Sequence, residues 1–155
     1  YYRKFKLLLR FEIISYIKKN FDNKFVLIGD DWVKYNMKSV SSNFDTKYIK
    51  QLYQGNICLD LGSMQGSSSL YSRSNQIIES GGLIIQSRQE DYNKIWGQLE
   101  KKILFKNLKE LTMLINKLSN DGSYSKQLLD EIYKNFSSSN KMIEENLDKI
   151  TKIVN

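Results

Sequence analysis

The chain contains no histidine and no proline, and it has one cysteine among its 155 residues. Histidine is the commonest general base and a frequent metal ligand, so its absence excludes most nucleophilic and metal-dependent mechanisms for these residues. Cys58 alone cannot form an intramolecular disulfide or a cysteine-based metal site. No apolar run approaches the ~20 residues that a membrane-spanning helix needs. We therefore expect a cytoplasmic protein without a membrane span.

The bulk composition is that of a globular protein, with 41% hydrophobic and 26% charged residues. We expect one domain over residues 1–155, with Cys58 buried inside the apolar run ICLDL. The net charge of +7 favours an anionic partner. The basic residues are spread along the chain instead of forming one cluster, so we expect no nucleic acid as partner. The charge fits a nucleotide phosphate equally well and does not identify the partner.

Short apolar runs alternate with helical patterns along the chain. We expect strands at residues 25–29, 56–61, 83–86 and 103–105, and a weak edge strand at 38–40. The expected helices are residues 5–20, a helix capped by Asp45 and ended by Gly55, and one running from Ser72 to Gly81. Residues 30–32 are expected to form a loop. This alternation predicts an α/β fold, a Rossmann-like three-layer sandwich with a parallel sheet.

The last third of the chain predicts a helical C-terminal tail. Asn107 and Glu110 have the spacing of a capping box, with asparagine in place of serine or threonine. Three apolar stripes follow, over residues 108–118, 124–136 and 143–154. The tail therefore adds helices after the last predicted strand.

A glycine- and serine-rich loop, residues 62–69, follows the second predicted strand of the sheet region. Glycine lets a backbone approach a ligand closely, and the helix after the loop adds free N–H groups, so the loop could hold phosphate. It could equally be a flexible surface loop. Arg73 stands in the first turn of that helix, where a cation is unfavourable unless an anion lies beside it. A solvated arginine is the alternative.

Residues 73–82 read RSNQIIESGG and are followed by the strand LIIQ. This segment resembles the motif R-x-x-E-x-x-A-x-G-G of the C-terminal, donor-binding domain of GT-B glycosyltransferases, in particular the group-1-like domain of CgeB-like spore-maturation proteins. Arg73, Gly81 and Gly82 match the motif, whereas Gln76 replaces its glutamate and Glu79 its alanine. Residues 25–32 (FVLIGDDW) are similar to the family's strand and Gly-x-x-Trp turn, and residues 103–121 to its late strand and helix.

The resemblance implies that the chain is half of a GT-B fold and part of a two-domain enzyme, with the N-terminal acceptor domain outside these residues. It implies binding of a nucleotide-diphosphate sugar for transfer to a hydroxyl acceptor, with no metal and no further cofactor. The arginine and loop would face the diphosphate and Gln76 the ribose. It identifies no catalytic residue. The expected donor-binding residues are Gly62, Ser63, Ser67, Ser68, Ser69, Ser72, Arg73, Gln76, Gly81 and Gly82.

Two other functions stay open. Because Gln76 cannot give the charge-assisted hydrogen bonds of a carboxylate, the chain could be a degenerate, non-catalytic module that binds a nucleotide sugar or a protein. A generic flavodoxin-like or nucleic-acid-binding protein is the third interpretation. Trp32 and Trp96 could pack in the core or stack on a base or sugar. The acidic pairs Asp30–Asp31 and Glu90–Asp91 could form turns or contact sugar hydroxyls.

Overall fold

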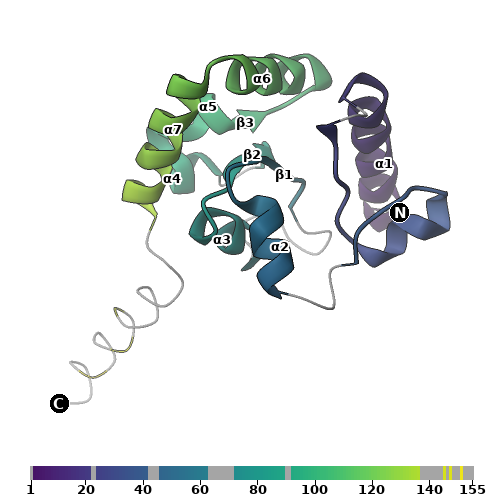
Figure 1. The fold of residues 1–155 in the computed structure, drawn as a ribbon, viewed down its shortest axis with the longest axis horizontal. Helices are drawn as coiled ribbons and strands as arrows, with labels where there is room; N and C mark the ends of the chain where they lie inside the picture. The colour runs from purple at the N-terminus through teal and green to yellow at the C-terminus, as the bar shows by residue number, and fades with distance from the viewer. Residues whose placement is uncertain are drawn as a thin grey trace. The chain divides into compact units, whose positions relative to one another are not determined.

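The computed structural model describes residues 2–21, 24–41, 46–62, 72–89 and 92–136, together with 145, 147 and 151 (Figure 1). They form a mixed α/β structure that is mostly helical and contains a small parallel sheet. The chain divides into two compact units. The first consists of Tyr1–Leu52 with Ser63–Gly66, and the second of Tyr53–Gly62 with Ser67–Asn155.

The first unit begins with helix α1, Tyr2–Phe21. The helix buries Ile13, Ile14 and Ile17, which share one side because Ile17 follows Ile13 by four residues and Ile14 by three. The predicted helix over residues 5–20 is confirmed; Leu9, which lies one turn before Ile13, is exposed. Lysines in the last turn complement the negative end of the helix dipole.

Residues 25–29 do not form the predicted strand of the sheet. Their strand-like pairing is an isolated parallel bridge between Ile28 and Val40, in which Gly29 N donates to Val40 O at 2.8 Å. Gly29 has φ +136°, and the 3-10 helix η2, Asp30–Tyr35, starts directly after it. The extended segment therefore ends at Gly29, and among the described residues its pairing is this one bridge. The expected loop at residues 30–32 is the start of η2, and of residues 38–40 only Val40 pairs.

The second unit contains the sheet. Its described strands are β1 (Ile57–Asp60), β2 (Leu83–Ser87) and β3 (Leu104–Phe105), all parallel and in the order β1-β2-β3. Each lies within one or two residues of a predicted strand, so the α/β class and the parallel pairing are confirmed for these three segments. In the described residues β1 is an edge of this sheet.

After α1 and η2, the described residues contain seven further helices. The helix α2, Thr46–Tyr53, ends where the second unit begins. The others are α3 (Ser72–Glu79), α4 (Tyr92–Trp96), η3 (Gly97–Leu99), α5 (Glu100–Ile103), α6 (Leu108–Asn120) and α7 (Gly122–Asn135). Helices α3, α5, α6 and α7 each contact the strands (Figure 1). Fully buried apolar side chains between these elements form the core, namely Ile84, Ile85, Ile103, Leu111, Leu128 and Ile132.

The predicted cap of α6 is confirmed. Asn107 Oδ1 accepts a hydrogen bond from Glu110 N at 2.9 Å, and Glu110 Oε2 accepts one from Lys106 N at 2.8 Å. Two N–H groups at the start of the helix therefore have side-chain partners. Within the predicted stripes, α6 buries Leu111 and Leu118. The third stripe, residues 143–154, falls almost entirely outside the described residues, and Asp45 lies outside them.

Cys58 is buried in β1, as predicted. Burial raises the pKa of its thiol to about 12, so the thiol is protonated at neutral pH. In the part of the chain that the structure describes, no helix is long and apolar enough to cross a membrane.

Candidate functional site

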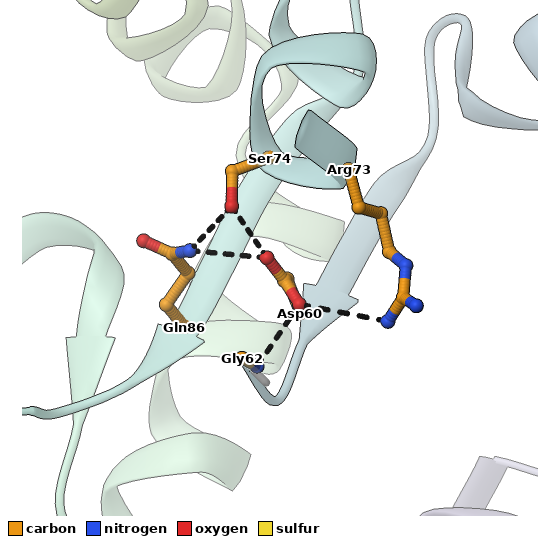
Figure 2. A network of polar contacts seen from close by, with 5 residues as sticks. All are labelled: Asp60, Gly62, Arg73, Ser74 and Gln86. Carbon is orange, nitrogen blue, oxygen red and sulfur yellow. Dashed lines mark hydrogen bonds and ion pairs between the residues drawn. The ribbon is translucent and has the colours of Figure 1, made fainter. Parts of the chain in front are cut away.

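A group of polar residues in the second unit lies where β1 and β2 end. Asp60 and Gln86 are register partners in these parallel strands, so their side chains lie on the same face of the sheet. The first turn of α3 supplies Arg73 and Ser74 above them (Figure 2). We call Asp60, Gly62, Arg73, Ser74 and Gln86 the strand-end cluster. Open α/β sheets usually bind ligands at the carboxyl ends of their strands.

Asp60 is the centre of the strand-end cluster and is 2% exposed. Its Oδ2 accepts hydrogen bonds from Ser74 Oγ at 2.6 Å and from Gln86 Nε2 at 3.2 Å. Its Oδ1 accepts one from Gly62 N at 3.0 Å. Ser74 and Gln86 are themselves fully buried. Burying a carboxylate is costly unless donors surround it, and here three donors do so.

The amide of Gln86 has one usable orientation. Trp96 Nε1, which can only donate, bonds to Gln86 Oε1 at 2.9 Å. This contact leaves Nε2 directed at Asp60 Oδ2 and at Ser74 Oγ, the latter at 3.1 Å. Four segments far apart in the sequence, β1, α3, β2 and α4, are therefore joined by one hydrogen-bonded network.

Gly62 turns the chain immediately after β1. Its φ of +70° lies in the left-handed region, and this turn returns its N–H group to the carboxylate two residues earlier. A Cβ atom at Gly62 would stand 2.8 Å from Gln89 Nε2. Both the backbone angle and the space therefore favour glycine here.

Arg73 is the exposed member of the strand-end cluster. Its side chain is 60% exposed, and Nη1 lies 4.0 Å from Asp60 Oδ1 (Figure 2). The expectation that an anion lies beside this arginine is met by a carboxylate of the chain itself. The distance is long and the guanidinium is largely solvated, so this pair contributes little to stability. Arg73 is therefore available to contact an anion arriving from solvent.

Charges of the strand-end cluster affect the pKa of Tyr53. Burial raises the pKa of Tyr53, and the positive charge of Arg73 opposes that rise. Among the described residues there is no group of histidine, cysteine, aspartate and glutamate side chains that could hold a metal ion. Chemically, the cluster offers a fixed carboxylate, a solvated cation and the N-terminal N–H groups of α3.

The structure brings some of the predicted donor-binding residues together and separates others. Gly62 and Arg73 meet at Asp60. Gly81 and Gly82 lie at the other end of α3, before the amino end of β2. There, Gly81 N and Gly82 N donate to the carbonyls of Ile78 and Ile77, and so end the helix.

Gly82 also permits close packing. A Cβ atom on it would stand 2.9 Å from Ile77 Cγ2, 3.0 Å from Cys58 Sγ and 3.0 Å from Tyr53 O. The two glycines that match the family motif thus have a structural role in this chain. Their role here is to end α3 and to start β2 close to β1.

Of the remaining predicted residues, the structure describes Ser72 and Gln76, and neither makes a described contact with the strand-end cluster. Ser72 is the first residue of α3 and is exposed. Gln76 is exposed one turn further along α3, and its carbonyl accepts a hydrogen bond from Ser80 Oγ at 2.6 Å. Ser63, Ser67, Ser68 and Ser69 lie outside the described residues, as do Glu90 and Asp91.

Sequence reasoning missed Asp60, Ser74 and Gln86 as site residues. The available signal was a polar residue at the end of each of two apolar strands, ICLD and LIIQ. Trp96 is buried and packs against Phe136 with ring centroids 4.3 Å apart, so packing describes it better than stacking on a ligand. Trp32 is half-buried and packs against Tyr35 in the first unit.

Comparison of the chain with protein-family models, with curated proteins and with solved structures found no match. The resemblance to a glycosyltransferase donor domain therefore depends on the motif residues alone. Apart from that resemblance, the structure shows a mixed α/β protein with a buried polar network at the ends of parallel strands.

Proposed function

We propose that the second unit is the donor-binding part of a GT-B type glycosyltransferase and binds a nucleotide-diphosphate sugar. On this proposal the described sheet belongs to a Rossmann-like sandwich, and an acceptor domain completes the enzyme. The observation that carries the proposal is the position of Arg73. It is an exposed cation at the start of α3, beside the carboxyl ends of β1 and β2, where the family motif expects the donor diphosphate.

The proposed chemistry uses the freedom of Arg73 to move and the fixed position of Asp60. Arg73 would turn from its 4.0 Å contact with Asp60 to the diphosphate oxygens, and the N–H groups at the start of α3 would donate to the same anion. These donors would stabilise the negative charge that grows on the diphosphate as the sugar leaves. Asp60 would keep its three other donors throughout, so it would not compete for the ligand.

Gln76 favours the second candidate, a module that binds a nucleotide sugar without transferring the sugar. Its side chain is exposed on α3 and can accept from one ribose hydroxyl and donate to another. It lacks the charge of the family's glutamate. The variant Gln76→Glu tests the pocket that both candidates require: a gain in donor affinity would support a surviving sugar-nucleotide pocket, and sugar transfer to an acceptor would separate the candidates.

The test is a thermal-shift measurement against nucleoside diphosphates and their sugars, since a ligand that binds the folded state raises the melting temperature. Arg73→Ala should weaken nucleoside-diphosphate binding by roughly 1.5–3 kcal/mol, the range for hydrogen bonds to charged groups. Gln76→Ala should cost less. Lys101→Ala, which removes an exposed cation from α5, is the matched control and should leave affinity unchanged.

Equal affinity of the Arg73→Ala variant and the wild type would overturn the donor-site assignment. Binding of oligonucleotides that weakens steeply with salt would instead favour a nucleic-acid-binding protein.

A further inference from the structure

Helix α1 of the first unit has a second apolar face that the described structure leaves exposed. Phe5 and Leu8 are each 66% exposed and Leu9 is 45% exposed. Their spacing of three and four residues places them on one side of the helix. Phe5 and Leu8 lie away from the buried isoleucines, and Leu9, one turn before Ile13, lies at the border between the two sides. Three bulky apolar side chains exposed together mark a surface for association.

The charges on the same helix indicate what this surface meets. From Lys4 to Lys19, α1 carries five basic residues and a single acidic one, Glu12. Lys4 lies one turn before Leu8, and Lys19 lies two turns after Glu12 on the same side; both are exposed. A cation therefore precedes the apolar face and Glu12 follows it, and the stretch from Lys4 to Lys19 has four more basic than acidic residues, five against one. A second copy of the chain would bring the same cations together, which opposes self-association through this face.

We propose that this face of α1 binds the surface of a membrane that contains anionic lipids. The helix lies in the plane of the interface, with Phe5, Leu8 and Leu9 at the boundary of the acyl chains. Lys4 and Lys19 extend to the lipid phosphates, each adding electrostatic attraction. The proposal is independent of the donor site, because α1 belongs to the first unit and the strand-end cluster to the second.

The test is sedimentation of the full chain with vesicles. We expect binding to vesicles of phosphatidylcholine with phosphatidylglycerol, much weaker binding to phosphatidylcholine alone, and a decline as salt is raised. The double variant Phe5→Gln/Leu8→Gln should lower the partition coefficient at least about tenfold, because it removes the apolar contribution. Met113→Gln is the matched control: Met113 is 63% exposed on α6 and its replacement should change nothing.

Two charge variants separate lipid binding from a general loss of structure. Lys4→Glu/Lys19→Glu should abolish the preference for anionic vesicles, whereas Glu12→Gln should strengthen it. Far-UV circular dichroism of each variant verifies that the helices remain. Equal binding to neutral and anionic vesicles, or no binding to either, would overturn the proposal. So would a concentration-dependent dimer in analytical ultracentrifugation that Phe5→Gln/Leu8→Gln removes, since the occupant would then be a second copy.

Discussion

Gln86 Nε2 donates to Asp60 Oδ2 at 3.2 Å across the parallel strands β1 and β2, and the two residues are register partners. Each is almost completely buried. The pair therefore joins the carboxyl ends of two strands through side chains in addition to the backbone ladder. The two residues are separated by 26 positions in the sequence, and they depend on α3 and α4 for further hydrogen bonds.

Exchanging the charge between these two residues tests the network. Asp60→Asn should lower the free energy of unfolding by about 1–3 kcal/mol, because in either orientation its new N–H₂ group faces a donor, which is Gly62 N–H in one orientation and the groups of Ser74 and Gln86 in the other. Gln86→Glu should cost about 3 kcal/mol or more, because it buries a second carboxylate beside the first. In the double variant the new amide at position 60 donates to the new carboxylate at position 86. We therefore expect recovery of at least about 1 kcal/mol relative to additive losses, measured by urea denaturation.

For that cycle, Asp130→Asn on the exposed side of α7 is the control and should change stability by less than about 0.5 kcal/mol. Strict additivity of the two single variants would mean that Asp60 and Gln86 do not interact in solution.

Gly62→Ala should destabilise the second unit by about 1–2 kcal/mol. The φ of +70° is strained for alanine, whereas the contact with Gln89 Nε2 is with the end of a flexible side chain and can relax. The matched control is Gly122→Ala at the first residue of α7, where φ is not positive and a Cβ meets nothing within 4 Å. Thermal unfolding compares the two. A loss at Gly62 no larger than at Gly122 would contradict the turn geometry.

Gly82→Ala should also destabilise, for a different reason. Its Cβ would press on Tyr53 O, a backbone atom that cannot easily move aside, as well as on Cys58 Sγ and Ile77 Cγ2. We expect a loss of about 1–3 kcal/mol, the usual cost of overpacking a core. At Gly81 a Cβ meets nothing within 4 Å, so Gly81→Ala reports the strain of its positive φ alone. If Gly82→Ala left stability intact and weakened nucleotide binding, Gly82 would be a ligand residue after all.

Because Cys58 is buried, we expect the free energy of unfolding to fall at alkaline pH. Its folded pKa of about 12 exceeds its ordinary value of 9.0, so above pH 9 the unfolded chain releases a proton that the folded chain keeps. The stabilisation is full below pH 9 and is lost as the pH rises toward 12, by up to about 1.4 kcal/mol per pH unit. Tyr53, whose pKa burial also raises, acts in the same direction.

The measurement is urea unfolding between about pH 8.5 and about pH 10.5, a range that brackets the ordinary pKa of a thiol. Trp96 fluorescence in a Trp32→Phe background follows the transition. Cys58→Ala should show a shallower decline with pH than the parent. Parallel declines would indicate that Cys58 ionises as readily in the folded as in the unfolded chain.

The parts of the fold that local sequence determines were predictable. The runs at β1, β2 and β3 are short and apolar, and Asn107 with Glu110 marks the start of α6 because a cap depends on residues three apart. Residues 25–29 look the same locally, yet they make one bridge and no sheet strand. Strand formation needs a partner, and an apolar run does not reveal whether it has one.

The features of the site that depend on residues close together in the sequence could be predicted, and those that depend on distant residues could not. The position of Arg73 in the first turn of α3 was predicted, and the structure gives it Asp60 as an anionic neighbour. That the anion is Asp60 could not be read from the sequence, because its burial depends on donors 14 and 26 residues away. Gly81 and Gly82 illustrate the reverse: the motif was recognised, but in this structure the two glycines end a helix.

The fixed orientation of the Gln86 amide gives the network a direction. The hydrogen bonds described in it all run from a donor toward Asp60, beginning at the Trp96 indole. Rotating that amide by half a turn would set two N–H groups against each other at Trp96 and an oxygen against the carboxylate. Such a rotation would lose the hydrogen bonds of this amide to Trp96, Asp60 and Ser74 together. Among the described members of the strand-end cluster, Asp60, Gly62, Ser74 and Gln86 therefore have one arrangement of their hydrogen bonds, and Arg73 is the member exposed to solvent.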